Sequence, residues 1–235
     1  MKRFSHIAAA ALLTLGLTTT AEAEDNVVLV ELFTSQGCSS CPPADANLAA
    51  LADRSDVLAL SMHVDYWDYL GWKDTFGNSE NTRRQYAYRD SMGARVVYTP
   101  QMIVQGSHDV PGYRPDLIEK AITTVAATEQ GTQISITQTA TGLIAQISMG
   151  EVRGTCTVWM ASYRQSATVE IARGENAGRS ITYSNVVDKL MRVGTSLRNA
   201  PKTLNLPLPS EGGGVAVWVQ SDQTGEILAA SYVEG

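Results

Sequence analysis

The chain has 235 residues, a formal net charge of −6 and 44% hydrophobic residues. Domains usually contain about 100–200 residues, so this length and composition suffice for one large or two small hydrophobic cores. The acidic balance and the lack of a basic patch in the sequence exclude the classes of protein that bind nucleic acids through their phosphates.

Residues 1–23 have the pattern of a secretory signal peptide. Lys2 and Arg3 precede an apolar stretch at 7–17, which ends in an Ala-Glu-Ala sequence at 21–23. The apolar stretch is too short to span a bilayer, and no later segment approaches ~20 continuous apolar residues. We therefore expect a periplasmic or secreted mature chain without a membrane span, in a compartment where disulfides persist.

A Cys-x-x-Cys motif follows the first predicted strand, which is a nearly continuous apolar run at 27–33 typical of a strand buried on both faces. Apolar residues at i, i+4 and i+7 from Ala44 predict a helix, so Cys38 lies at or near a helix N-terminus, where backbone N–H groups stabilise a thiolate. Cys38 is thus the expected attacking thiol and Cys41 the resolving thiol. The prolines at 42–43 predict a distorted or delayed first turn.

The rest of the first half alternates between strand and helix patterns. The expected elements are a strand at 57–64, an aromatic loop over the site at 65–72, a helix at 80–92, a strand at 96–106 and a helix at 115–126. From about residue 132 onward, short alternating strands separated by glycine-containing turns predict a β-rich unit. The change of pattern predicts a domain boundary near 128–132.

This order of elements, with the Cys-x-x-Cys motif before a helix and Thr99-Pro100 opening a strand, resembles that of thioredoxin-like proteins. A fuller resemblance is to a bacterial family of secreted thioredoxin-like proteins of unassigned function. It is carried by residues 31–45, which include Gly-Cys-Ser-Ser-Cys-Pro-Pro-Ala-Asp, and by a second block at 173–187. The resemblance implies an α/β thioredoxin-like domain at 25–130, and we expect a β-rich, sandwich-like domain at 131–235.

The resemblance also implies roles for particular residues. Cys38 resembles the nucleophile, Cys41 the resolving thiol and Pro100 a cis-proline that packs against the disulfide. The backbone of Thr99 would then pair with a substrate chain.

Two departures from thioredoxins qualify these roles. Gly37 stands where thioredoxins usually carry tryptophan, and Leu32 occupies the position of the buried aspartate that assists proton transfer. Glu31, its neighbour, would point to the opposite face of the strand. These departures argue against efficient reduction of the thioredoxin kind and leave oxidation, isomerisation or specialised reduction open.

The sequence therefore predicts an exported thiol–disulfide oxidoreductase that acts on protein or small-molecule disulfides and needs no organic cofactor. Two alternatives use the same cysteines. One is a copper-handling protein, since two thiolates with a nearby His or Met suit Cu(I), and the candidates are His63, His108, Met62 and Met102. The other is a partner-binding module with a structural disulfide. No second Cys-x-x-Cys exists to complete a zinc site.

Two further features lie in the second half. Cys156 is expected to be a small buried hydrophobic residue in a strand, with a mixed-disulfide relay as the alternative. Glu175, Asn176 and Arg179 occupy a polar, glycine-bounded turn, which we expect to be internally hydrogen bonded, with partner binding as the alternative.

Overall fold

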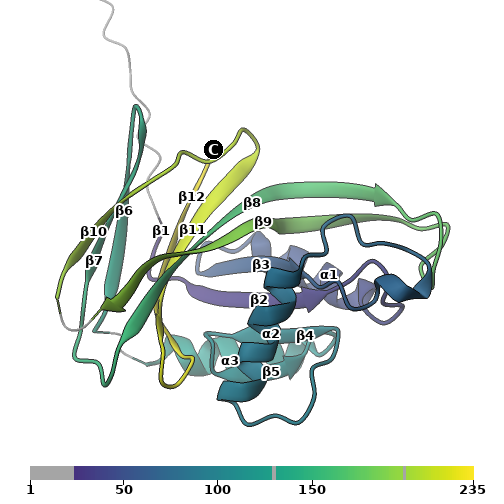
Figure 1. Cartoon of the computed structure of the whole chain (residues 1–235), viewed down its shortest axis with the longest axis horizontal. Coiled ribbons are helices and arrows are strands. Elements are labelled where there is room, and N and C mark those ends of the chain that lie inside the picture. The colour runs from purple at the N-terminus through teal and green to yellow at the C-terminus, as the bar shows by residue number, and fades with distance from the viewer. Residues whose placement is uncertain (1–23, 129–130, 198–199) are drawn as a thin grey trace, which may run out of the picture.

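In the computed structural model, which describes residues 24–128, 131–197 and 200–235, β-strands predominate (Figure 1). The signal peptide predicted at residues 1–23 lies outside the described residues. None of the helices in the described part of the chain is long and apolar enough to cross a membrane.

The helices are α1 (Pro42–Ala52), α2 (Ser79–Ser91) and α3 (Pro115–Ala126), with a short 3-10 helix, η1, at Asp68–Leu70. The strands before residue 128 are β1 (Glu24–Asp25), β2 (Val28–Thr34), β3 (Val57–His63), β4 (Gln101–Val104) and β5 (His108–Pro111). The later strands are β6 (Gln133–Thr139), β7 (Gly142–Ser148), β8 (Cys156–Glu170), β9 (Ser180–Leu197), β10 (Lys202–Leu206), β11 (Gly213–Ser221) and β12 (Ile227–Glu234).

Among these strands, nine form one mixed sheet in the order β1-β12-β11-β8-β9-β3-β2-β4-β5, and three form a second sheet in the order β10-β7-β6. Strands from both sides of residues 128–132 therefore share one sheet. Our expectation of an α/β thioredoxin-like domain followed by a β-rich, sandwich-like domain is wrong, because β3 of the first half pairs directly with β9 of the second.

The seam between β3 and β9 is made by groups that are distant in the sequence. Ser61 lies opposite Val186 in a parallel pairing. The Asn185 side chain donates a hydrogen bond of 2.9 Å to the carbonyl oxygen of Ala59, which is 126 residues away. A local pattern cannot reveal such a pairing, and this is why the sequence suggests separate folds for the two halves.

Alternate residues of β2 enter two different hydrophobic cores, and all seven of its residues are buried. Leu29 and Phe33 belong to a core that includes side chains of α2, whereas Val30 and Leu32 belong to a core beneath α1 and α3. A third core lies between the large sheet and the three-stranded sheet. The prediction of a first strand buried on both faces is confirmed.

A buried ion pair ties α2 to the centre of the large sheet. The Arg84 guanidinium forms a two-pronged contact with the Glu31 carboxylate and donates to the Tyr88 hydroxyl at 2.7 Å. The guanidinium carbon also lies 5.0 Å from the ring centres of Trp159 and Trp218. Glu31 thus faces the α2 side of the sheet, away from the face that Leu32 shares with α1.

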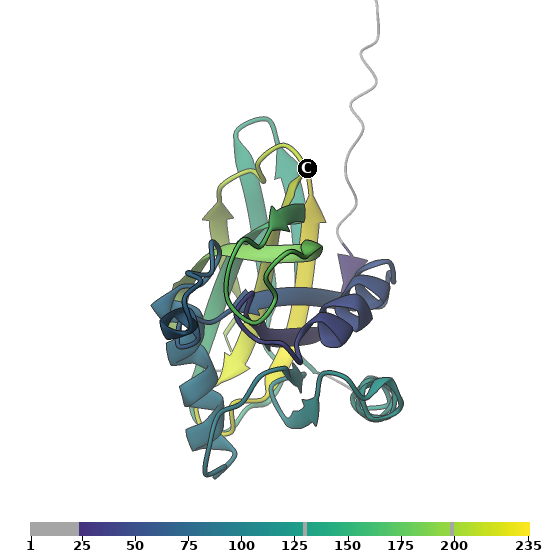
Figure 2. The same cartoon turned by 90° about the vertical axis from the view of Figure 1, so that its right-hand side faces the viewer.

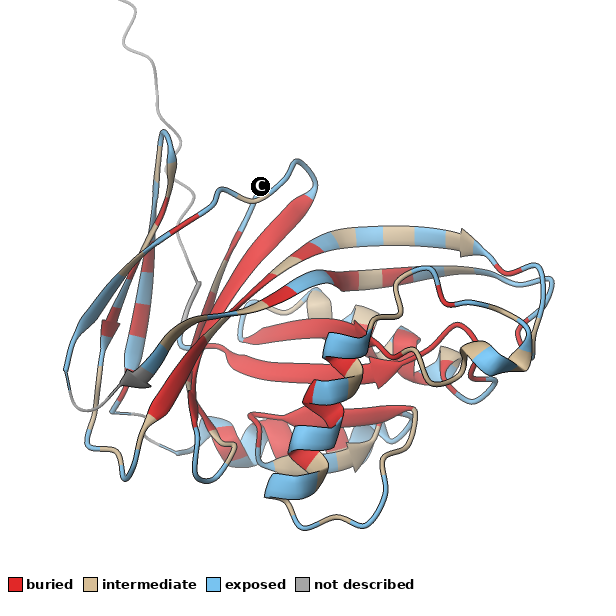
Figure 3. Cartoon of the chain, in the orientation of Figure 1, coloured by how far each residue is buried: buried red, intermediate tan, exposed pale blue. Residues whose placement is uncertain are grey.

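β8 and β9 form a long antiparallel hairpin that extends beyond β11 (Figure 1). β11 pairs with β8 only between Cys156 and Arg164, whereas β9 pairs with β8 as far as Glu170. In the distal part of β8, exposed and partly buried residues alternate (Figure 3). β9 of this hairpin contacts α1. The tip of the hairpin faces the viewer in Figure 2.

Candidate functional site

The Cys-x-x-Cys motif occupies the loop between β2 and α1. β2 ends at Thr34, and Cys41 is the N-cap residue of α1, with Pro42 and Pro43 in the first two helical positions. Proline is suited to these positions because their N–H groups have no partner within the helix. The first turn is not delayed, since α1 begins at Pro42 and the N–H groups of Ala44 and Asp45 both donate to the Cys41 carbonyl oxygen, at 2.8 and 3.0 Å.

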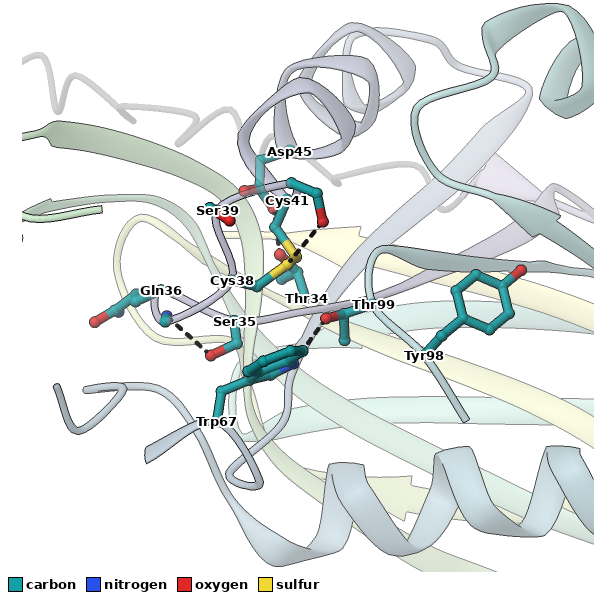
Figure 4. Close-up of a disulfide and its surroundings, with 12 residues drawn as sticks. Thr34, Ser35, Gln36, Cys38, Ser39, Cys41, Asp45, Trp67, Tyr98 and Thr99 are labelled. Atoms are coloured by element: carbon teal, nitrogen blue, oxygen red, sulfur yellow. Dashed lines mark hydrogen bonds between the residues drawn. A yellow bond between two sulfur atoms is a disulfide. The ribbon is translucent and has the colours of Figure 1, made fainter. Parts of the chain in front are cut away.

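Cys38 and Cys41 form a disulfide, with 5.4 Å between their Cα atoms (Figure 4). Cys41 is completely buried and Cys38 is 2% exposed. The Ser40 hydroxyl lies 3.4 Å from the Cys38 sulfur. A disulfide that closes so short a loop removes little entropy from the unfolded chain, so it contributes little to stability through crosslinking.

The loop that contains Thr99 and Pro100 lies beside the first turn of α1. The Thr99–Pro100 peptide bond is cis. Gly112 donates to the Pro100 carbonyl oxygen at 3.0 Å. A Cβ atom on Gly112 would lie 2.8 Å from the Ala44 Cβ and 3.3 Å from the Pro100 Cβ, so the absence of a side chain allows this close approach.

The aromatic segment at 65–72 contacts both of these loops. The Trp67 indole N–H donates to the Thr99 hydroxyl at 2.8 Å (Figure 4). A Cβ atom on Gly37 would lie 3.2 Å from the Trp67 Cβ. Trp67 therefore lies next to Gly37, the position where thioredoxins usually carry a tryptophan of their own.

The tip of the β8–β9 hairpin, at residues 171–179, also binds the Cys-x-x-Cys loop. The Asn176 amide donates to the carbonyl oxygens of Gln36 and Cys38, at 2.9 and 2.8 Å, and Asn176 is buried. The Glu175 carboxylate accepts from the Ser39 N–H at 3.1 Å. Hydrogen bonds from Ser39 lower the pKa of Glu175. The expected internal hydrogen bonds of this turn are confirmed, since the Ala177 N–H donates to Gly174 and the Arg179 N–H donates to Asn176, both at 3.2 Å. The sequence pattern does not reveal the additional contact with the cysteine loop.

Gln36 connects the loop to residues 72–75, at the end of the aromatic segment and directly after it. Its backbone N–H donates to the Asp74 carboxylate at 2.7 Å, and its side-chain amide donates to the Thr75 hydroxyl at 2.9 Å. The Trp72 indole N–H in turn donates to the Gln36 side-chain oxygen at 2.8 Å. The loop between β2 and α1 is thus held by two parts of the chain, residues 67–75 and the tip of the β8–β9 hairpin, which restrict its conformations.

A buried polar cluster lies beneath the first turn of α1. Asp45 accepts from the Thr34 hydroxyl at 2.8 Å, and burial raises the pKa of Asp45 to about 7 although His63 and Thr34 act in the opposite direction. The His63 Nδ1 atom lies 2.8 Å from the Asp74 carboxylate. Burial disfavours the charged form of Asp74, but His63 and the N–H groups that Asp74 binds leave its pKa below the ordinary value. Residue spacing alone does not reveal this cluster.

The other residues considered from the sequence lie as follows. Cys156 is buried in the core between the two sheets, as expected for a small hydrophobic residue, and burial raises the pKa of its thiol. Met62 and Met102 belong to cores on opposite faces of the large sheet. His108 lies in β5 and contacts the Ser107 hydroxyl. Among the described residues, no group of three or more His, Cys, Asp and Glu side chains is arranged to hold a metal ion.

Comparisons with known proteins add a family and a fold. The family described as "Protein of unknown function (DUF1223)" matches residues 29–220. A crystal structure of a protein from Agrobacterium tumefaciens is 34% identical to this chain, with a TM-score of 0.77 over 89% of this chain and 95% of the other. HBP35 of Porphyromonas gingivalis is 11% identical, with a TM-score of 0.60 over 88% of this chain and 74% of the other. No curated protein matches the chain.

Proposed function

This chain belongs to the DUF1223 family, and we propose that it is an exported thiol–disulfide oxidoreductase that uses Cys38 and Cys41. The single observation that supports the proposal best is the position of the disulfide. It lies at the N-terminus of a helix, in a loop held by residues 67–75 and by the tip of the β8–β9 hairpin, and next to the Thr99–Pro100 loop. The proposal depends on this local geometry and does not require a thioredoxin-like domain.

Cys38 is the better candidate for the attacking thiol. It is the slightly exposed cysteine, whereas Cys41 is completely buried. In the reduced protein, a Cys38 thiolate can only accept hydrogen bonds, so the Ser40 hydroxyl at 3.4 Å would donate to it. The positive end of the dipole of α1 adds to this stabilisation and raises the fraction of nucleophile at neutral pH.

The reaction in the reducing direction has two steps. The Cys38 thiolate attacks one sulfur of a substrate disulfide and forms a mixed disulfide, while the other substrate sulfur leaves as a thiolate. The Cys41 sulfur, after losing its proton, then attacks the Cys38 sulfur and releases the second substrate thiolate. The Cys38–Cys41 disulfide is formed and one substrate disulfide is reduced to two thiols. The oxidising direction is the reverse.

The substrate would approach at the Thr99–Pro100 loop. The hydrogen bonds described for this loop use the hydroxyls of Tyr98 and Thr99 and the carbonyl oxygens of Tyr98 and Pro100. We propose that the Thr99 backbone pairs with an extended substrate chain and that Pro100 limits how closely the chain approaches the sulfurs. Protein and small-molecule disulfides are both candidate substrates, in a periplasmic or extracellular compartment where such disulfides persist.

A redox titration tests the proposal. The mature protein is equilibrated in glutathione buffers of graded ratio without metal, and the state of the Cys38–Cys41 pair is followed by thiol trapping. A potential between ~−270 and ~−120 mV, as in known exchange proteins, would support the proposal and indicate the direction. Cys41→Ser should accumulate a mixed disulfide on Cys38, and Cys38→Ser should abolish exchange, whereas Cys156→Ala should change neither.

A pair that stays oxidised in every buffer, or that never oxidises, would contradict the proposal. Stoichiometric binding of Cu(I) by the reduced protein, with no exchange activity, would favour the copper-handling alternative. Retention of a bound partner by both cysteine variants would favour a binding module with a structural disulfide.

A further inference from the structure

Asp45 lies one helical turn after Cys41. Side chains four residues apart in a helix share a face, and the Asp45 N–H bonds to the Cys41 carbonyl oxygen at 3.0 Å, as expected of regular helical geometry. Both residues are buried, and Figure 4 shows them together above the end of β2. The carboxyl group therefore lies on the side of α1 where the resolving cysteine lies.

One oxygen of this carboxyl group is unused. Oδ1 accepts from Thr34, whereas Oδ2 is buried and has no hydrogen-bond partner within the described part of the chain. An unpaired carboxylate oxygen in a buried position is costly, so the group favours its protonated form. Burial accordingly raises the pKa of Asp45 to about 7, and the group can both hold and release a proton at neutral pH.

The titratable groups around Asp45 come from four segments. They are Cys41 at the N-cap of α1, His63 on β3, Asp74 in the loop before α2, and Tyr183 on β9. His63 lowers the pKa of Asp45, whereas Asp74 raises it. The His63 Nε2 atom is, like the Asp45 Oδ2 atom, buried and unpartnered among the described residues.

The other buried carboxylates near the loop have hydrogen-bond partners on both oxygens. Glu31 is paired with Arg84 on the opposite face of the sheet. Asp74 accepts from His63 and from the N–H groups of Gln36, Phe76 and Gly77. Glu175, which accepts from the Ser39 N–H, is exposed, so Asp45 is the buried carboxyl group of this set that has an unpartnered oxygen among the described residues.

We propose that Asp45 takes the proton from Cys41 when this cysteine resolves a mixed disulfide, and returns it when the disulfide is reduced. The inference rests on the proposed function, because it assigns a proton to a step of that reaction. In this chain Leu32 occupies the position of the buried aspartate that assists proton transfer in thioredoxins, and leucine cannot carry a proton. The proposal assigns the proton transfer to Asp45 instead.

The step balances as follows. The Asp45 carboxylate accepts the proton of the Cys41 thiol and becomes neutral. The Cys41 thiolate attacks the Cys38 sulfur, the bond between Cys38 and the substrate sulfur breaks, and the substrate leaves as a thiolate. In the oxidising direction, neutral Asp45 donates its proton to the Cys41 thiolate as this thiolate leaves the Cys38–Cys41 disulfide.

The two steps can be separated with an aromatic disulfide, 5,5′-dithiobis(2-nitrobenzoate), as the probe. The reduced, full-length mature protein is mixed with the probe in a stopped-flow instrument. Attack by Cys38 releases one coloured thiolate, and resolution by Cys41 releases a second. The rate of each phase is measured between pH 5 and 9 for the wild type, Asp45→Asn, Thr34→Val and Asp53→Asn.

For the wild type, the rate of the second phase should rise with pH around a midpoint of about 7. Asp45→Asn should slow this phase by about tenfold or more at neutral pH and remove the midpoint, while the first phase is unchanged. Thr34→Val keeps the carboxyl group but loses a hydrogen bond that lowers its pKa, so the midpoint should move to higher pH. Asp53, the exposed C-cap residue of α1, is the matched control, and Asp53→Asn should behave as the wild type.

The outcomes distinguish the two hypotheses. If the wild type shows no second phase, the proposed function fails and this inference fails with it. If the wild type shows both phases and Asp45→Asn retains the same pH profile, the inference is overturned while the proposed function stands. If Asp45→Asn does not fold, the Thr34→Val midpoint decides, and an unshifted midpoint overturns the inference.

Discussion

The side-chain amide of Asn176 donates a hydrogen bond of 2.8 Å to the carbonyl oxygen of Cys38, which lies 138 residues earlier in the chain. The same nitrogen also binds the Gln36 carbonyl oxygen, so one side chain closes the loop that carries the candidate nucleophile. The conformation of the loop around Cys38 therefore depends on a residue from the second half of the molecule.

We expect Asn176→Ala to free this loop. Two buried carbonyl oxygens would lose their donor, which costs about 1–3 kcal/mol of stability, and Cys38 would become more accessible. Urea unfolding should show the loss of stability, and alkylation of the reduced protein by iodoacetamide, followed by mass spectrometry, should show faster modification of Cys38. Arg179→Ala changes an exposed side chain of the same turn and should have neither effect. Equal alkylation rates for both variants would show that Asn176 does not control access.

The buried carboxyl group of Asp45 should make stability depend on pH. Because its folded-state pKa is raised to about 7, the folded state binds a proton more tightly than the unfolded state between the unfolded pKa and about 7. Protonated Asp45 therefore contributes to the stability of the folded state. This contribution is fully present below the unfolded pKa and is lost as the pH rises through about 7. Asn cannot titrate, so Asp45→Asn should match the wild type near pH 4 and be more stable at pH 8, by at most roughly 4 kcal/mol.

Urea unfolding of the oxidised wild type and the Asp45→Asn variant at several pH values measures this difference. Asp53→Asn serves as the control, because the side chain is exposed on the same helix. A difference between Asp45→Asn and the wild type that stays constant from pH 4 to 8 would mean that Asp45 does not titrate in this range.

The buried ion pair between Glu31 and Arg84 should be costly to break. Arg84→Met leaves the Glu31 carboxylate without a counter-charge in a core that contains Trp159 and Trp218, and we expect a loss of about 3–5 kcal/mol in urea unfolding. Replacing both partners, with Glu31→Gln added to Arg84→Met, should recover part of this loss because no uncompensated charge remains. A double variant less stable than Arg84→Met alone would count against this account.

The N-terminal pattern should direct export. We expect the mature protein recovered from the periplasm or the medium to begin at Glu24, as measured by mass spectrometry of the intact chain. Replacing two leucines of the apolar stretch at 7–17 with charged residues should retain the full-length precursor inside the cell. A full-length chain in the exported fraction would contradict cleavage at this position.

Much of the first half could be predicted from local patterns. The strand expected at 27–33 is β2 (Val28–Thr34), the strand expected at 57–64 is β3 (Val57–His63), and the helix expected at 115–126 is α3 (Pro115–Ala126). These elements have strong apolar periodicity or clear boundaries. The strand expected at 96–106 is shorter, because β4 begins only at Gln101, after the cis peptide bond.

The joined sheet and most of the site could not be predicted in this way. β3 and β9 pair through a single register position, and nothing in either strand identifies its neighbour. Asp45 resembles any polar helical residue in the sequence, and its burial depends on Thr34 and on elements that fold over α1. The contacts of Asn176 likewise cannot be read from local patterns. Its position in the second block of the family resemblance, at 173–187, was the one sequence feature that pointed to this turn.

Asn176 lies 138 residues after Cys38 in the chain, and this separation also sets the order in which their contact can form. During synthesis from the N-terminus, β2, the cysteines and α1 leave the ribosome long before the β8–β9 hairpin exists. Until the residues of its tip have been made, the Asn176 and Glu175 contacts with the cysteine loop cannot form. The cysteines thus pass through an early stage in which solutes and other chains meet them without this cover, and only the finished protein encloses them.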